Sequence, residues 1–292
     1  MVRHRVTHST TYAYVQPVAL CHNEIRLTPR ATAAQRPRRT QLLVEPVPSS
    51  LTTSVDYFGN TVTFMTVQEP HEQITITAMS DVDVTSGPPV HPADTLPWET
   101  VRDHVWSQRG VGSYEAFEYL LESPHVRVDD EVAAYAAPSF APGRPVLAAA
   151  LELSGRIHAD FAYVPRATTI ATPVSEVLAG RRGVCQDFAH LAIGCLRSLG
   201  LPARYVSGYI ETEPPSGQPR LVGADASHAW CSAFVPGLGW YDVDPTNADA
   251  LADRRITVAW GRDYGDVAPV RGVVFGPPSS QELTVAVDVA RV

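Results

Sequence analysis

Apolar and polar residues alternate with a period of two in the first part of the chain, a pattern that is typical of half-buried strands. Five segments rich in Thr, Val, Tyr and Ile carry it, at residues 6–14, 42–47, 52–58, 61–67 and 74–84. Gly59 and Asn60 lie between two of these segments and favour a hairpin turn. The pattern therefore predicts an antiparallel, β-sandwich-like module.

Residues 86–92, Ser-Gly-Pro-Pro-Val-His-Pro, interrupt this alternation and indicate a linker. Past the linker, apolar positions recur with the spacing of helices. The segments with this spacing are 98–108, 114–121, 129–137, 145–159 and 173–179. We therefore predict two domains, a β-rich domain of residues 1–87 and a second domain of residues 92–292 that includes the C-terminal strands.

The clearest helical pattern follows Cys185. Apolar residues recur there three and four positions apart, at Phe188, Leu191, Ala192, Cys195, Leu196 and Leu199. Gly200 and Pro202 are typical of a helix end. The pattern predicts a buried amphipathic helix that carries Cys185 in its first turn.

Strand-like segments follow this helix, at residues 203–210, 226–235, 240–243 and 255–260, and apolar residues alternate again over 283–289. Helices followed by a run of strands are typical of the α+β class. The sequence thus predicts an α+β fold in which helices pack on an antiparallel sheet, preceded by the β module.

Composition narrows the class of protein and of partner. Apolar residues make up 45% of the 292 positions and charged residues 18%, which is typical of a globular chain. A net charge of −8 disfavours binding to nucleic acid or to an anionic membrane surface. Four cysteines in so long a chain do not suggest a disulfide framework, and no apolar run follows the first residues. We therefore expect a cytoplasmic protein with reduced thiols.

Cys185 is the candidate nucleophile. A thiol at a helix N-terminus lies at the positive end of the helix dipole, which stabilises the thiolate. Most free cysteines are buried packing residues, and Cys195 fits that description because it lies on the apolar stripe. Cys185 instead follows Arg181, Arg182 and Gly183, which form a basic and open approach.

A thiol nucleophile needs a general base, and His228 at the start of a predicted strand is the leading candidate. His190 is closer in sequence. However, five residues along a helix rotate a side chain by about 140° relative to Cys185, so the two point apart. We therefore expect His190 to be a packing residue.

A carboxylate that orients the imidazole is expected on the returning strand, which offers Asp242 and Asp244. An odd-numbered loop, residues 235–239, would place Asp244 beside Trp230 and diagonal to His228. Asp242 would then lie opposite Ser232, farther from His228. An even-numbered loop would turn Asp244 away from His228. The candidate catalytic residues are thus Cys185, His228 and Asp244.

A zinc site is the alternative that the residue types suggest, since cysteine and histidine are common zinc ligands. Cys185 and Cys195 are ten residues apart on one helix, or about 15 Å, so they cannot share an ion. His228 and Cys231 face opposite sides of a strand. We therefore expect no metal and no other cofactor.

Three stretches closely resemble the bacterial transglutaminase-like proteins: residues 181–190 around Cys185, residues 200–209, and residues 227–247 with His228 and Asp244. Residues 18–30 and 56–60 resemble the N-terminal region of the same family, so nearly the whole chain is covered. The resemblance implies a papain-like core with Cys185 as nucleophile, His228 as general base and Asp244 as its partner.

The expected reaction is acyl transfer from a carboxamide in a peptide or protein substrate, through a thioester on Cys185. The attack creates an oxyanion, which the backbone N–H of Cys185 would hold. Tyr163 is a candidate second donor to this oxyanion, or a packing aromatic. Acyl transfer to water would make the protein a cysteine peptidase or amidase, which we favour because no calcium-binding motif is present. The alternatives are a protein-glutamine transglutaminase, which uses an amine acceptor, and a non-enzymatic binding module.

Residues 211–224 form the loop that we expect to determine substrate specificity.

Overall fold

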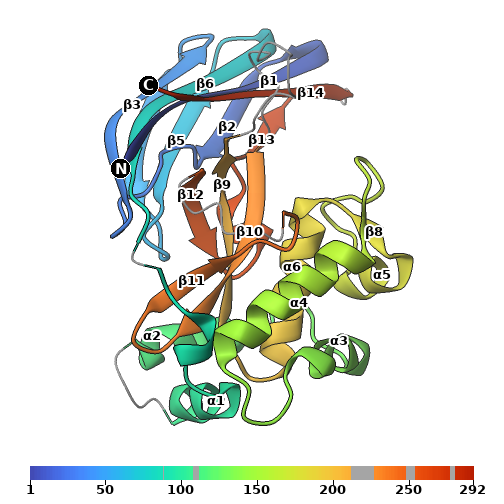
Figure 1. The fold of residues 1–292 in the computed structure, drawn as a ribbon. Helices are drawn as coiled ribbons and strands as arrows, with labels where there is room; N and C mark the ends of the chain where they lie inside the picture. Colours follow the sequence, from blue (N-terminus) through green and yellow to red (C-terminus); the bar gives the residue numbers. More distant parts are fainter. Residues whose placement is uncertain (88, 108–111, 212–226, 248–253, 277–279) are drawn as a thin grey trace, which may run out of the picture.

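The computed structural model describes residues 1–87, 89–107, 112–211, 227–247, 254–276 and 280–292. Its β-rich part is a sandwich of two four-stranded sheets (Figure 1). In spatial order, one sheet contains β14 (Gln281–Arg291), β1 (Val2–Val18), β6 (His71–Val84) and β3 (Gln35–Glu45). The other contains β13 (Val270–Phe275), β2 (Leu20–Ile25), β5 (Thr61–Val67) and β4 (Ser50–Val55). Residues of both sheets, including Ile25, Met65 and Ile76, form one buried core.

The predicted sandwich is present, but its membership differs from the prediction. The sequence pattern assigned the C-terminal strands to the domain of residues 92–292. Instead, β14 pairs with β1 from His4–Arg291 to Tyr14–Gln281, and β13 pairs with β2. Both ends of the chain therefore lie in the β module, and the α+β part is inserted between them (Figure 1).

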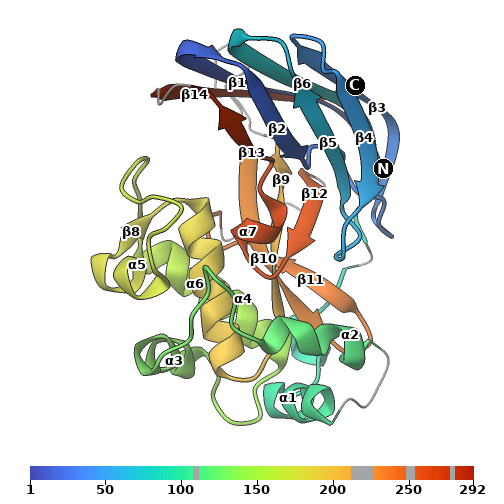
Figure 2. The same ribbon diagram turned by 180° about the vertical axis from the view of Figure 1, so that it is seen from behind.

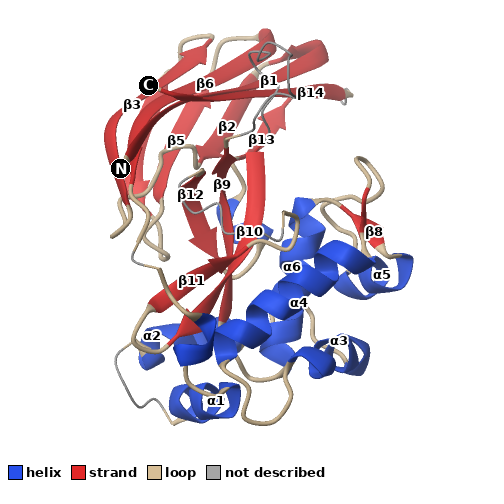
Figure 3. Cartoon of the chain, viewed as in Figure 1, coloured by secondary structure: helices blue, strands red, loops and turns tan. Residues whose placement is uncertain are grey.

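The inserted part has the predicted α+β architecture, in which helices pack on a four-stranded antiparallel sheet (Figure 3). In spatial order, the sheet contains β11 (Gly239–Val243), β10 (Ser227–Val235), β9 (Ala203–Ile210) and β12 (Arg255–Gly261). The helices are α1 (Trp98–Trp106), α2 (Ser113–Phe117), α3 (Asp130–Ala136), α4 (Val146–Asp160), α5 (Val174–Gly180), α6 (Cys185–Ser198) and α7 (Tyr264–Val267). Short 3-10 turns follow α2 (η2, Glu118–Leu120) and α3 (η3, Ala137–Ser139), and another precedes α1 (η1, Pro92–Asp94). Among the described helices, none is long and apolar enough to cross a membrane.

Helix α6 is the centre of the second core. Its apolar stripe packs against β9 and β10, and Phe188, Leu191 and Cys195 are buried there as predicted. After Leu199 the chain turns at Gly200, whose φ of +74° is favourable only for glycine. This packing places the N-terminus of α6, which carries Cys185, at one end of the sheet.

Two side-chain amides join the sandwich to the outer edge of this sheet. Asn60 donates to the carbonyl of Trp260 over 2.9 Å and accepts the N–H of the same residue over 2.9 Å. Gln35 makes the same pair of bonds with Thr257, over 2.7 and 2.8 Å. The amides satisfy the free backbone groups of edge strand β12 much as another strand would. The β module therefore caps the sheet that carries His228.

Asn60 is fully buried, and its substitution by alanine should lower the free energy of unfolding by about 3 kcal/mol, because it leaves the N–H and C=O of Trp260 without these partners. Urea denaturation measures the change. Gln41→Ala, at an exposed position of β3, is the control and should change the stability by less than about 0.5 kcal/mol. Equal effects of the two substitutions would show that the amide contacts do not stabilise the fold.

Candidate active site

Cys185 is the first residue of α6 and is half-buried. The turn before it is held by Asp187, whose Oδ2 accepts the N–H of Val184 over 2.8 Å and the hydroxyl of Thr168 over 2.6 Å. A Cβ on Gly183 would lie 2.7 Å from that oxygen, so only glycine fits beside the carboxylate. The sequence therefore positions the thiol rigidly at the free N–H groups of the helix end.

The other thiols have different surroundings. Cys21, Cys195 and Cys231 are buried, and all four cysteines are free. The Sγ of Cys231 lies 3.4 Å from the carbonyl oxygen of Val243, inside the core. Burial raises the pKa of the Cys195 thiol to about 12. Among the four, Cys185 is the thiol that a substrate can reach. Within the described parts of the chain, no group of three or more His, Cys, Asp or Glu side chains could hold a metal ion.

His228 lies near the start of β10 and is 8% exposed. Its Nε2 is 2.8 Å from Oδ2 of Asp244. The Cys185 side chain is near enough to the ring to raise its pKa. Since Nε2 faces the carboxylate, Nδ1 is the nitrogen left for the thiol. The structure therefore brings the three predicted site residues together in the order thiol, imidazole, carboxylate.

The charges of these groups stabilise one another. Burial alone would lower the pKa of His228, but the hydrogen bond to Asp244, the negative charge of Asp244 and the nearby Cys185 outweigh burial and raise the pKa to about 9. Burial opposes ionisation of Asp244, yet the hydrogen bond from His228 and its positive charge hold the pKa of that carboxyl below its usual value. At neutral pH the imidazolium and the carboxylate are thus both charged.

Strand register selects Asp244 over Asp242. Asp242 lies opposite Ser232, as predicted for an odd-numbered loop. The turn itself is shorter than the predicted 235–239, because Val235 and Gly239 still pair. Asp244 follows at the end of β11, where its Oδ1 accepts the backbone N–H groups of Thr246 and Asn247 over 3.0 and 3.3 Å. These bonds fix the carboxylate with Oδ2 towards the imidazole.

Asn247 is a contact that the sequence did not predict. Its Nδ2 donates to Oδ2 of Asp244 over 3.0 Å and lies 3.2 Å from Nε2 of His228. The amide therefore covers the histidine–aspartate pair. The signal in the sequence is the stretch Asp-Pro-Thr-Asn, since a chain that turns at Pro245 returns the asparagine side chain to Asp244.

Tyr163 lies beside the nucleophile. Its two-residue strand β7 (Ala162–Tyr163) pairs in parallel with β8 (Arg182–Gly183), with Tyr163 opposite Gly183. The side chain is 53% exposed, and its ring centroid is 6.3 Å from that of Phe188. Burial, followed by the nearby Cys185, raises the pKa of the hydroxyl. Its proton is therefore available for a hydrogen bond at neutral pH.

His190 has the packing role that its place on α6 predicts. Its ring stacks on His125 at 5.8 Å, and its Nε2 accepts the N–H of Tyr264 over 3.1 Å. Burial lowers the pKa of His190 to about 3, so the ring is neutral. The predicted specificity loop, residues 211–224, lies outside the described residues from position 212 onwards.

A cysteine at a helix N-terminus, next to a His–Asp pair on an antiparallel sheet, is the arrangement of the papain-like thiol enzymes, and this chain has the fold of that class. Residues 4–83 match the family model of the bacterial transglutaminase-like N-terminal region, and residues 133–245 match that of the transglutaminase-like superfamily. The second match includes Cys185, His228 and Asp244. The chain belongs to the transglutaminase-like superfamily.

Three proteins are similar to this chain over almost its whole length. An uncharacterized protein of Mycobacterium tuberculosis is 43% identical over 98% of this chain and 92% of its own length. An uncharacterized protein of Mycobacterium leprae is 34% identical over 100% of this chain and 99% of its own. A crystal structure of a candidate cysteine protease from Cytophaga hutchinsonii has a TM-score of 0.77 at 20% identity, and covers 100% of this chain and 91% of that one. At this identity the structural likeness shows a shared fold.

Because of the His228–Asp244 pair, the free energy of unfolding should fall as the pH rises into the alkaline range. A pKa raised to about 9 in the folded state, against 6.5 in the unfolded chain, adds stability that is fully present below pH 6.5 and is lost as the pH rises through 9. Relative to His228→Gln, the protein should therefore lose about 3 kcal/mol of unfolding free energy between about pH 6 and pH 10. Urea denaturation at both pH values measures this, and parallel losses in the two proteins would contradict the ion pair.

Proposed function

We propose that the protein transfers acyl groups from carboxamides of a peptide or protein substrate, with Cys185 as nucleophile, His228 as general acid and base, and Asp244 as the orienting carboxylate. The observation that carries the proposal is the bond of 2.8 Å between His228 and Asp244, beside a half-buried thiol at a helix N-terminus. An imidazolium held next to this thiol favours the thiolate form.

In the proposed reaction the Cys185 thiolate attacks the carbonyl carbon of the substrate. The tetrahedral oxyanion is held by the backbone N–H of Cys185, and we assign the second donor to the hydroxyl of Tyr163. The C–N bond breaks as the imidazolium of His228 gives its proton to the leaving amine. A thioester then links the acyl group to Cys185. Attack by an acceptor, with His228 as base, releases the product and restores the thiol.

We propose water as the main acceptor, which makes the protein a cysteine peptidase or amidase. Water is always present at the thioester and needs no binding site of its own. Transfer to an amine is the second candidate. It is supported by a protein-glutamine gamma-glutamyltransferase of Pseudomonas aeruginosa, which is 38% identical to this chain over 92 residues, 30% of this chain and 14% of that protein.

A panel of glutamine peptides, incubated with and without a fluorescent primary amine, separates the two acceptors. Ammonia release and product mass are measured, with Cys185→Ala as the control. Hydrolysis predicts ammonia and a glutamate product whether or not the amine is present. Amine adduct formed in preference to glutamate would show a transglutaminase. No product in any reaction, with the thiol shown to be reduced, would favour a binding module that only keeps the fold.

Four free thiols support a reducing compartment, so we propose a cytoplasmic location. Free thiols can be alkylated in intact cells and Cys185 then analysed by mass spectrometry, before and after reduction. A cytoplasmic location predicts an alkylated Cys185. Recovery of Cys185 in a disulfide would contradict this location.

A further inference from the structure

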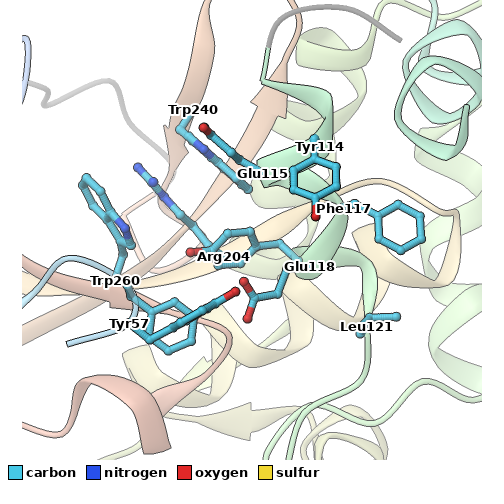
Figure 4. Close-up of a pocket in the computed structure, with 11 residues that line it drawn as sticks. Tyr57, Tyr114, Glu115, Phe117, Glu118, Leu121, Arg204, Trp240 and Trp260 are labelled. Carbon is cyan, nitrogen blue, oxygen red and sulfur yellow. The ribbon is translucent and has the colours of Figure 1, made fainter. Parts of the chain in front are cut away.

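A cavity of about 930 Å³ lies apart from the candidate active site. It is formed by the turn between β4 and β5, by α2 and η2, and by one face of the sheet (Figure 4). Figure 2 shows where these elements lie in the fold. That face is the one opposite α6: Tyr205 of β9 contacts His190 of α6, so the neighbouring Arg204 points to the other side. Neither Cys185, His228 nor Asp244 lines the cavity.

Arg204 lines this cavity with its guanidinium group between two tryptophan rings (Figure 4). The group lies 3.7 Å from the ring centroid of Trp260 and 4.5 Å from that of Trp240. The residue is only 8% exposed, and its Nε has no hydrogen-bond partner. Among the described residues, no carboxylate forms an ion pair with it. The faces of the cation are therefore covered, while its buried Nε–H has no partner.

Arg197 shows how this fold treats an arginine that is purely structural. It is 4% exposed, and it donates to the carbonyls of Tyr119, Ala203 and Arg262 and to the hydroxyl of Ser123. Burial lowers the pKa of both arginines to about 10, so each is charged at neutral pH. A buried charge without hydrogen bonds is costly, and Arg204 bears that cost where Arg197 does not.

The remaining walls limit the kind of ligand. Most are aromatic, among them Phe58, Tyr119 and Trp240, and such walls accept a flat apolar group. Two carboxylates, the exposed Glu115 and the half-buried Glu118, also line the cavity and disfavour a second negative charge on the ligand. The planar N–H edge of an arginine matches the two oxygens of a carboxylate.

We propose that this cavity is a binding site for a monocarboxylate with a flat aromatic body, whose carboxylate pairs with Arg204. The site is separate from the thiol chemistry. Arg204 pairs with Ser232 and Gly208 pairs with His228, so the two sites are separated by four residues of β9, roughly 13 Å along the strand. Because Phe58 comes from the β module and Trp260 from the sheet, the ligand would contact both parts of the molecule.

Isothermal titration of the full-length protein with three probes that share an indole body tests the proposal. Indole-3-acetate carries a carboxylate, indole-3-ethanol a hydroxyl and tryptamine an ammonium group. The acid should bind about tenfold more tightly than the alcohol, because only the acid forms charge-assisted bonds to Arg204. Equal binding of acid and alcohol, tighter binding of tryptamine, or no binding of the acid at millimolar concentration would overturn the proposal.

Two substitutions locate the binding. Arg204→Lys keeps the charge but loses the planar edge, and should weaken binding of the acid about fivefold or more. Glu118→Gln removes a negative charge from the cavity and should tighten it about two- to fourfold. Glu131→Gln, at an exposed position of α3, is the matched control and should leave the affinity unchanged. If Arg204→Lys does not fold, Glu118→Gln decides, since an unchanged or weaker affinity in that variant would contradict the site.

Discussion

Replacing Cys185 by alanine should lower kcat/KM for the carboxamide substrate by about 10⁴-fold or more, because no other group can form the thioester. The side chain is half-buried and packs at the margin of the core, and alanine removes only its sulfur atom, so the variant should fold as the parent protein does. The rate of product formation, measured on the most reactive peptide of the glutamine panel, gives the result.

Cys195→Ala is the matched control, since it removes a thiol from the same helix. Cys195 is buried, and its Sγ lies 3.8 Å from the carbonyl oxygen of Val132. Its loss leaves a small cavity and costs about 1 kcal/mol of stability, but kcat/KM should stay within about twofold. A Cys185→Ala variant with activity close to that of Cys195→Ala would show that the nucleophile is a different residue.

Asp244→Asn should lower kcat by about 10³- to 10⁴-fold, because a neutral amide no longer orients and stabilises the imidazolium of His228. The pKa of His228 should fall as well, since the hydrogen bond and charge of Asp244 are among the causes that raise it. The alkaline limb of the pH–rate profile should therefore move to lower pH, which a loss of folded protein alone would not produce.

Asp242→Asn separates this effect from a general loss of charge on β11. Asp242 lies two residues earlier on the strand, opposite Ser232, and has no bond to His228. This variant should keep kcat within about threefold of the parent and leave the pH profile unchanged. If Asp242→Asn caused the larger loss, the register argument for Asp244 would be wrong.

The sequence predicted the parts of the site that depend on local periodicity. The apolar stripe from Phe188 to Leu199 predicts α6, and the start of that stripe places Cys185 in the first turn. The pairing of β10 and β11 needs only an odd-numbered turn, because side chains alternate between faces with a period of two. Asp244 was therefore predictable from a hairpin, without any long-range contact.

Strand partners were not predictable in this way. Alternation in residues 283–289 predicts a strand, but it carries no information about the neighbour, and β14 pairs with β1 at the other end of the chain. Strand β2 was missed because its middle, Cys-His-Asn-Glu, lacks the β-branched and aromatic residues that mark a strand. Non-local pairing decided the membership of the sandwich.

Polar contacts between distant segments were also hidden. Asn60 is typical of a hairpin turn, and the turn is present, yet its side chain also binds the backbone of Trp260. Asn247 covers His228 because the chain turns after Asp244. Arg204 lies in a mostly apolar strand, and the sequence gave no sign that two tryptophans from other strands would enclose it. Each of these roles depends on tertiary packing.

The rate at which iodoacetamide alkylates Cys185 tests the central claim most directly, since it reports the thiolate without any knowledge of the substrate. Mass spectrometry resolves this thiol from the three buried cysteines. Near neutral pH, Cys185 should react about tenfold or more faster than a free thiol peptide, and His228→Ala should abolish that advantage. Labelling no faster than the peptide, and unchanged by His228→Ala, would contradict a thiol activated by the His228–Asp244 pair.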